Sequence, residues 1–146
     1  MREIKFRGKR LDNGEWIYGP YSEFEHNEDK SHKHYVIIVA PLLEDPTLPI
    51  LYEVNPETVG QFTGFEYKNG RKIYEGDYCR LINSGGWTGY GVVQFVDGCF
   101  ELLFKEPLWD SSLRCYRQQD YLKCWIVNCA IEIIGNIHDN PELLDS

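Results

Sequence analysis

Histidine and carboxylate side chains gather in one polar segment, residues 23–34, which is the densest group of potential metal ligands in the chain. Its members are His26, His32, His34, Glu23, Glu25, Glu28 and Asp29. Imidazole and carboxylate groups bind ions such as Zn²⁺, and strand alternation would place His32 and His34 on one face. The spacing matches no recognised ligand pattern. We therefore favour a solvated surface loop over a metal or pH-sensing site.

The cysteines are the next candidates for chemistry, and they are Cys79, Cys99, Cys115, Cys124 and Cys129. Their number is odd, none lies in a Cys-x-x-Cys pair, and no local signature sets a Cys beside a His base. This pattern is typical of reduced thiols that mainly fill a core. We expect no catalytic residues and no cofactor, and an enzyme is the less favoured class.

Residues 84–89 contain three of the chain's glycines but lack the Lys and the following helix that hold a phosphate. The segment instead predicts a mobile loop between strands. Trp87 and the nearby Tyr90 are candidates for exposed contacts.

A basic stripe is expected near the N-terminus, because strand alternation puts Lys5, Arg7 and Lys9 on the face opposite Phe6. Such a stripe favours nucleic acid if a neighbouring aromatic ring stacks on bases. The chain as a whole carries a net charge of −8, which repels polyanions. Nucleic-acid binding is therefore an alternative, and a soluble strand edge is the favoured interpretation.

Aromatic and arginine side chains alternate in the segment that follows residue 108. The candidates for a protein interface are Trp109, Arg114, Tyr116, Arg117, Tyr121 and Trp125. These residue types carry much of the energy of protein–protein binding, although core packing explains some of them equally well. The segment favours a protein partner, with self-association into a homo-oligomer as one form of it.

A scaffold made mainly of β-strands must position these side chains. The composition includes ten Tyr, seven Phe and four Trp, while 13 Gly and 7 Pro supply frequent turns. No apolar run approaches the roughly 18 residues of a membrane span, and residues 1–10 lack the apolar core of a signal peptide. We expect a mostly β, cytoplasmic protein with little helix and no membrane partner.

Local signals predict a β-hairpin over residues 4–21, because Asn13-Gly14 supplies the positive φ angles of a tight turn. Residues 22–33 are predicted as a surface loop. Further strands are predicted at residues 35–39, 50–54, 59–65, 72–74, 78–82, 91–96, 99–104 and 131–137. Residues 107–123 are loosely compatible with a helix that starts after Asp110, and residues 139–146 with a short acidic tail.

Four stretches of the sequence resemble the YopX family of phage and prophage proteins. They are MREIKFRGK at residues 1–9, VNPETVGQFTG at 54–64, KNGRKIYEGD at 68–77 and IGNIHDNPELL at 134–144. Their order and spacing cover nearly the whole chain. The resemblance implies a fold and a bacterial host cell, but it supplies no catalytic residues, because the family has no assigned biochemical role. The chain departs from the family pattern mainly at residues 23–34 and 108–129.

The Glu75-Gly76-Asp77 bend before a strand resembles a turn of SH3-like barrels, in which the Asp77 carboxylate accepts backbone N–H bonds. We therefore expect an N-terminal β-rich subdomain at residues 1–55 and an SH3-like, partly open β-barrel at residues 56–138. The favoured function is that of an accessory protein that binds other proteins. The alternatives are a weak nucleic-acid module and a metal-dependent enzyme.

Overall fold

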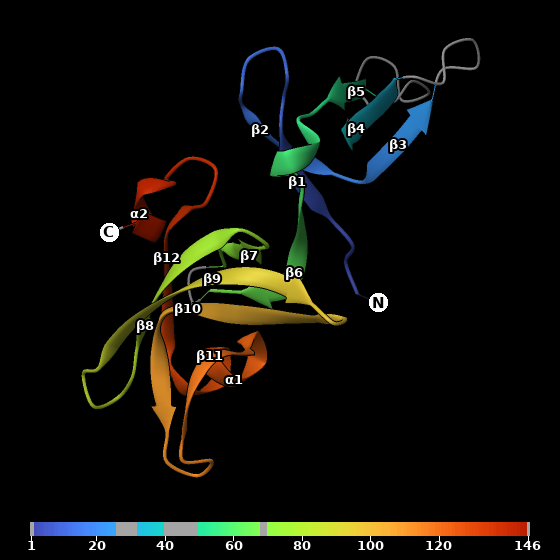
Figure 1. The fold of residues 1–146 in the computed structure, drawn as a ribbon. Coiled ribbons are helices and arrows are strands. Elements are labelled where there is room, and N and C mark those ends of the chain that lie inside the picture. Colours follow the sequence, from blue (N-terminus) through green and yellow to red (C-terminus); the bar gives the residue numbers. More distant parts are fainter. Residues whose placement is uncertain (1, 26–31, 40–49, 68–69, 146) are drawn as a thin grey trace. The chain divides into compact units, whose positions relative to one another are not determined.

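The computed structural model describes residues 2–25, 32–39, 50–67 and 70–145. The chain divides into two compact units, Met1–Gly64 and Phe65–Ser146. Both consist mainly of antiparallel β-strands (Figure 1), so the prediction of a mostly β protein with little helix is confirmed. The predicted subdomain boundary between residues 55 and 56 lies inside the first unit.

The predicted N-terminal hairpin is present in the first unit. Strand β1 (Phe6–Lys9) pairs with β2 (Trp16–Gly19) in an antiparallel register that sets Lys9 opposite Trp16. The connection turns at Gly14, which has φ 71°, and the Gly14 N–H donates to the carbonyl of Arg10 at 3.0 Å. Glycine adopts this left-handed conformation without steric cost. The turn therefore forms at Asn13-Gly14, as predicted.

A second sheet of the first unit has the order β3-β4-β5, with β3 at Tyr21–Glu25, β4 at Lys33–Val39 and β5 at Ile50–Glu53. Strand β4 buries Val36 and Ile37, as the apolar run predicted. The surface loop predicted over residues 22–33 is wrong at both ends, because residues 22–25 belong to β3 and Lys33 begins β4, while residues 26–31 lie outside the described residues. Polar side chains alternate there with Phe24, whose ring stacks on His34 of β4 at 5.1 Å.

A single 3-10 turn, η1 (Pro56–Thr58), follows, with the Asn55 side chain accepting from the Glu57 N–H at 3.1 Å. Next come β6 (Gly60–Glu66) and β7 (Lys72–Tyr74), which complete a sheet of order β2-β1-β6-β7. Strand β6 runs across the boundary between the two units.

The second unit contains a five-stranded antiparallel sheet of order β11-β10-β9-β8-β12 over its described residues. The strands are β8 (Asp77–Ile82), β9 (Thr88–Val96), β10 (Cys99–Asp110), β11 (Cys115–Tyr121) and β12 (Ala130–Asn136). Strands β9 and β10 join through Asp97 and Gly98, both with positive φ, the conformation of a two-residue hairpin turn. The SH3-like form of the barrel stays a prediction.

The helix predicted after Asp110 is wrong. Strand β10 continues to Asp110 and turns back into β11, and helix α1 (Leu122–Asn128) begins only afterwards. Leu113 and Tyr116, which a helix would have placed on an apolar face, are 64% and 70% exposed. The segment forms a β-hairpin instead, in which Trp109 lies opposite Tyr116 on the neighbouring strand. A second short helix, α2 (Glu142–Asp145), lies within the predicted acidic tail.

The core of the second unit lies on one face of the five-stranded sheet. Its fully covered side chains include Ile73, Leu81, Val93, Leu102 and Leu122. Partly buried Trp125 and Leu108 pack against this cluster. Helix α1 therefore attaches to the sheet through Leu122 and Trp125.

Asp77 has the structural role that the sequence predicted. Its side chain is 2% exposed, and Oδ2 accepts a hydrogen bond from the Tyr74 N–H at 2.9 Å. Gly76, at φ 88°, makes the bend that brings the two residues together. A buried carboxylate needs such donors, because desolvation penalises the charged form.

The thiols differ from the prediction of mainly packed cysteines. All five are free, but only Cys79 is buried, while Cys99, Cys115 and Cys124 are exposed. Of the three exposed thiols, Cys99 begins β10, Cys115 begins β11 and Cys124 lies on α1. No helix over the described residues is long and apolar enough to cross a membrane.

Candidate protein-binding cleft

A cleft of about 660 Å³ opens in the second unit beside the hairpin of residues 105–121, which we call the β10–β11 arm. Its apolar wall consists of Trp87, Phe104, Leu108, Trp109 and Trp125. These residues come from the turn before β9, from β10 and from α1. A concave surface lined by aromatic rings with a few polar groups is the usual form of a binding site.

The rings of the cleft contact one another in a short chain. The Phe104 ring meets the Trp125 ring edge-on with centroids 5.1 Å apart, and Trp125 meets Trp87 at 5.9 Å with a tilt of 42°. Phe104 is only 3% exposed, whereas Trp87 is 37% and Trp109 is 57% exposed. The cleft therefore has a fixed inner ring and accessible outer rings.

The turn at residues 83–87 positions Trp87. Asn83 Oδ1 accepts from the backbone N–H groups of Gly85 and Trp87, both at 2.9 Å. The Asn83 N–H in turn donates to the Trp87 carbonyl at 3.0 Å. The backbone of Trp87 is thus held on both sides, which orients the indole over β9.

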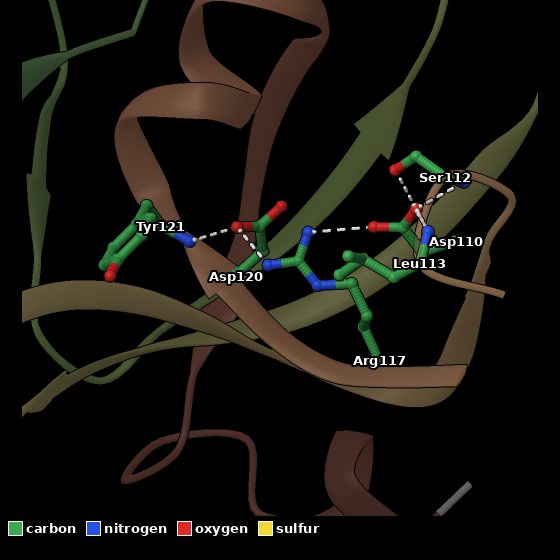
Figure 2. A network of polar contacts seen from close by, with 6 residues as sticks. All are labelled: Asp110, Ser112, Leu113, Arg117, Asp120 and Tyr121. Atoms are coloured by element: carbon green, nitrogen blue, oxygen red, sulfur yellow. Dashed lines mark hydrogen bonds and ion pairs between the residues drawn. The ribbon is translucent and has the colours of Figure 1, made fainter. Parts of the chain in front are cut away.

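Arg117 joins the two carboxylates of the arm (Figure 2). Its Nη2 lies 2.8 Å from Asp120 Oδ1, and its Nη1 lies 3.3 Å from Asp110 Oδ2. The Arg117 side chain is 34% exposed, while the Asp120 and Asp110 side chains are 15% and 18% exposed. This bridge links the far turn of the arm to the point where β11 meets α1.

Asp110 also closes the turn of the arm, as Figure 2 shows. Its Oδ1 accepts from the Ser112 hydroxyl at 2.6 Å, the Ser112 N–H at 2.9 Å and the Leu113 N–H at 3.1 Å. These donors, the Ser112 hydroxyl foremost, lower the pKa of the Asp110 carboxyl, and Arg117 adds to the effect. Asp110 is therefore ionised at neutral pH and is a poor proton acceptor.

Two polar groups of the cleft make no hydrogen bond to any residue that the structure describes. Trp125 Nε1 is a buried donor without a partner. Asp120 accepts bonds from Arg117 and from the Tyr121 N–H through Oδ1, which leaves Oδ2 unused. An unsatisfied buried donor costs about 1–3 kcal/mol of stability.

The six predicted interface residues separate into three groups. Trp109, Arg117 and Trp125 line the cleft. Tyr116 packs edge-on against Trp109, with ring centroids 5.1 Å apart. Arg114 lies in the turn at φ 53°, and Tyr121 lies 54% exposed at the end of β11, outside the cleft lining.

Sequence reasoning missed much of the cleft lining, including Phe104, Leu108, Asp110 and Asp120. The alternation of β10 up to residue 104 was a usable signal, because Phe104 continues the buried pattern of Leu102. Trp87 was anticipated only as an exposed contact, since nothing local connects it to Trp125.

A second cleft, of about 450 Å³, adjoins the first. The two share Trp87, Phe104, Leu108 and Trp109. The opposing walls of the second cleft are residues 88–90 of β9 and residues 105–107 of β10. The register between these strands ends at the pair of Gly91 with Phe104, so the second cleft lies where the two strands diverge.

The predicted basic stripe lies in the first unit, and two of its three cations lie over one indole ring. The Arg7 guanidinium is 4.8 Å and the Lys9 ammonium 5.6 Å from the centroid of Trp16. Arg7 is 6% exposed, and Lys5 lies 4.0 Å from the Glu3 carboxylate. Cation–π contact of this kind holds Arg7 and Lys9 against the Trp16 ring.

The histidine-rich segment is only partly described. His26, Glu28 and Asp29 lie outside the described residues. His34 Nδ1 contacts Glu53 Oε1 of the neighbouring strand and stacks on Phe24. No three potential metal ligands come together in the part of the chain that the structure describes.

Comparison with known proteins places the chain in a family. No curated protein matches it in sequence. The crystal structure of YopX from Bacillus subtilis matches with a TM-score of 0.55 and 17% identity, over 100% of this chain and 98% of that one. A crystal structure of a protein from Enterococcus faecalis matches with a TM-score of 0.48 and 22% identity, over 99% of both chains. The sequence model of the YopX protein family matches residues 5–145. With nearly its whole length matched, the chain belongs to the YopX family.

Proposed function

We propose that this YopX protein is a protein-binding accessory module whose binding surface is the aromatic cleft beside the β10–β11 arm. The observation that carries the proposal is the accessible wall of Trp87 and Trp109 around the fixed Phe104 ring. Exposed Trp side chains in a preformed cleft are typical of energetic centres of protein interfaces. Copies of the chain itself are among the partners that we propose, and a phage or prophage setting in the bacterial cytoplasm is part of the same proposal.

The charged groups of the cleft support binding over catalysis. Asp110 is tied to Ser112, Leu113 and Arg117, and its lowered pKa makes it a weak base. Arg117 is held between two carboxylates. Groups engaged in this way orient a partner, but they are poorly placed to exchange protons with a substrate.

An affinity pull-down with matched variants tests the proposal. The protein would be immobilised as wild type, Trp109→Ala and Leu113→Ala, incubated with a bacterial lysate with and without nuclease, and read by mass spectrometry. Leu113 is the control, because it is exposed on the same arm but lies outside the cleft. Proteins retained by wild type and Leu113→Ala but lost with Trp109→Ala support the proposal. Equal retention by all three variants overturns it.

Self-association is tested separately by sedimentation velocity over a range of concentrations. A dimer that Trp109→Ala converts to a monomer supports a homo-oligomer formed through the cleft. A monomer at every concentration excludes self-association through the cleft, and the pull-down then tests binding to other proteins. Nucleic-acid binding is the alternative, supported by the three basic residues and by the Trp16 ring beside two of them, and retention that disappears with nuclease would favour it instead.

A further inference from the structure

We propose that the second cleft binds an extended, basic segment of a partner protein by adding it as a strand to the open edge of β9. This inference rests on the proposed function and names the mode of binding and the chemistry of the partner. The proposal rests on an open strand edge at residues 88–90. Beside this edge lie the Trp side chains of the two clefts and Asp120 Oδ2, which no described residue uses.

The edge follows from the registers of β9. Residues 88–92 pair with β8, but pairing with β10 begins only at Gly91. Residues 88–90 are thus registered with one neighbour alone. Strand β10 diverges there through residues 105–107, which include Pro107, and its register with β11 shifts between Leu103 and Leu108. The two diverging segments face each other across about 450 Å³.

The direction of the backbone groups can be read from the ladder. The Asn83 N–H donates to the Trp87 carbonyl, so residue 87 directs its backbone groups toward β8. Alternate residues of an antiparallel strand point to the same neighbour. Thr88 and Tyr90 therefore direct their backbone groups away from β8, toward the second cleft. A strand edge with this orientation is the surface that strand addition uses.

The side chains around the edge define the chemistry of the segment. Because both clefts share Trp87 and Trp109, a side chain of a segment in the second cleft can extend into the first. There it meets three indole rings and the Asp120 carboxylate, whose Oδ2 is unused by the described residues. Indole faces attract Lys and Arg cations, and a carboxylate oxygen accepts their hydrogen bonds. The net charge of −8 favours the same choice at long range.

A library of random linear peptides displayed on phage provides the probe. After panning on the full chain, the selected peptides would be synthesised and their affinities measured by fluorescence anisotropy. We expect Lys or Arg among β-branched and aromatic residues, which favour strands. We also expect affinity to fall at least tenfold with Trp87→Ala and with Asp120→Asn, and to stay unchanged with Val127→Ala, which is 73% exposed on α1 but outside both clefts.

Methylation of peptide backbone nitrogens tests strand addition without altering the protein. Pairing with β9 uses every second peptide N–H, so methylation at alternate positions should weaken binding at least tenfold, and methylation between them should have little effect. Equal effects at all positions, with dependence on Trp87 kept, overturn strand addition and leave the proposed function intact. Selected peptides that bind Trp87→Ala and Trp109→Ala as tightly as wild type overturn both.

Discussion

The indole ring of Trp87 lies directly across Gly89, two residues further along the chain. A Cβ atom at residue 89 would lie 2.6 Å from Cζ2 of Trp87, closer than real Cβ atoms approach other carbons. Glycine at residue 89 is therefore what allows the ring to lie over β9 and to contact Trp125. The accessible wall of the cleft depends on a residue that contributes no side chain.

Gly89→Ala should displace Trp87 and break its contact with Trp125. Overpacking of this kind costs about 1–3 kcal/mol, and the loss of ring contact should change the near-ultraviolet circular dichroism and the Trp fluorescence. Gly85→Ala is the control, because its Cβ would meet only Asn83 Oδ1 at 3.4 Å. Identical spectra for Gly89→Ala and wild type would show that Trp87 does not occupy this position.

The turn of the arm should open in acid. The pKa of Asp110 is lowered from its ordinary value of 3.8 in the folded chain, chiefly by the Ser112 hydroxyl. A carboxyl with a depressed folded pKa stabilises the fold above its unfolded pKa and loses that contribution as the pH falls through the folded pKa. Carbon-detected NMR should give Asp110 a midpoint below 3.8, with amide exchange at Ser112 and Leu113 rising in the same range.

Ser112→Ala provides the check on that cause. Removing the hydroxyl should raise the midpoint of Asp110 toward its ordinary value, while the backbone donors of residues 112 and 113 keep part of the shift. A midpoint that does not move would mean that the hydroxyl is not the main donor.

Neighbouring leucines on β10 should differ sharply in their contribution to stability. Leu102 is 0% and Leu103 is 37% exposed, because successive side chains of a strand face opposite sides. Leu102→Ala creates a cavity and should cost about 2–5 kcal/mol, whereas Leu103→Ala should cost far less, since surface substitutions usually change stability by about 0.5 kcal/mol or less. Urea denaturation of the two variants measures the difference, and equal midpoints would contradict the register of β10.

Cysteine modification should follow exposure. Burial raises the pKa of the Cys79 thiol far above its ordinary value, and the nearby Asp77 charge adds to the shift. The thiolate is the reactive form, so iodoacetamide at mildly alkaline pH should modify Cys99, Cys115 and Cys124 first. Cys129, whose pKa burial also raises, should follow more slowly. Mass spectrometry after timed quenching gives the order, and early labelling of Cys79 in native protein would contradict the buried core.

The parts of the fold that sequence predicted correctly are those with local causes. The N-terminal hairpin turns at Asn13-Gly14, and the bend at Gly76 with the Asp77 carboxylate follows from residues adjacent in sequence. Glycine conformation and short-range hydrogen bonds determine such turns. They can therefore be inferred without knowledge of the tertiary structure.

The arm was missed because its causes are less local. Its turn contains no glycine, and Arg114 takes the positive φ while Asp110 closes the loop. Pro107, which usually interrupts strands, is accommodated by the register shift between Leu103 and Leu108. Helix α1 has no side-chain N-cap to mark its start. The cleft itself joins Trp87 to Trp125, a contact that no local pattern could indicate.

The pairing of β12 with β8 has a consequence for synthesis on the ribosome. Hairpins of neighbouring strands can form as soon as they emerge, but Leu81 pairs with Ile131 and Cys79 with Ile133. Such non-local pairings form late because a long loop must close first. Until residue 136 has been translated, β8 presents an apolar, unprotected edge, and nascent chains that stall before that point are expected to aggregate or to require a chaperone.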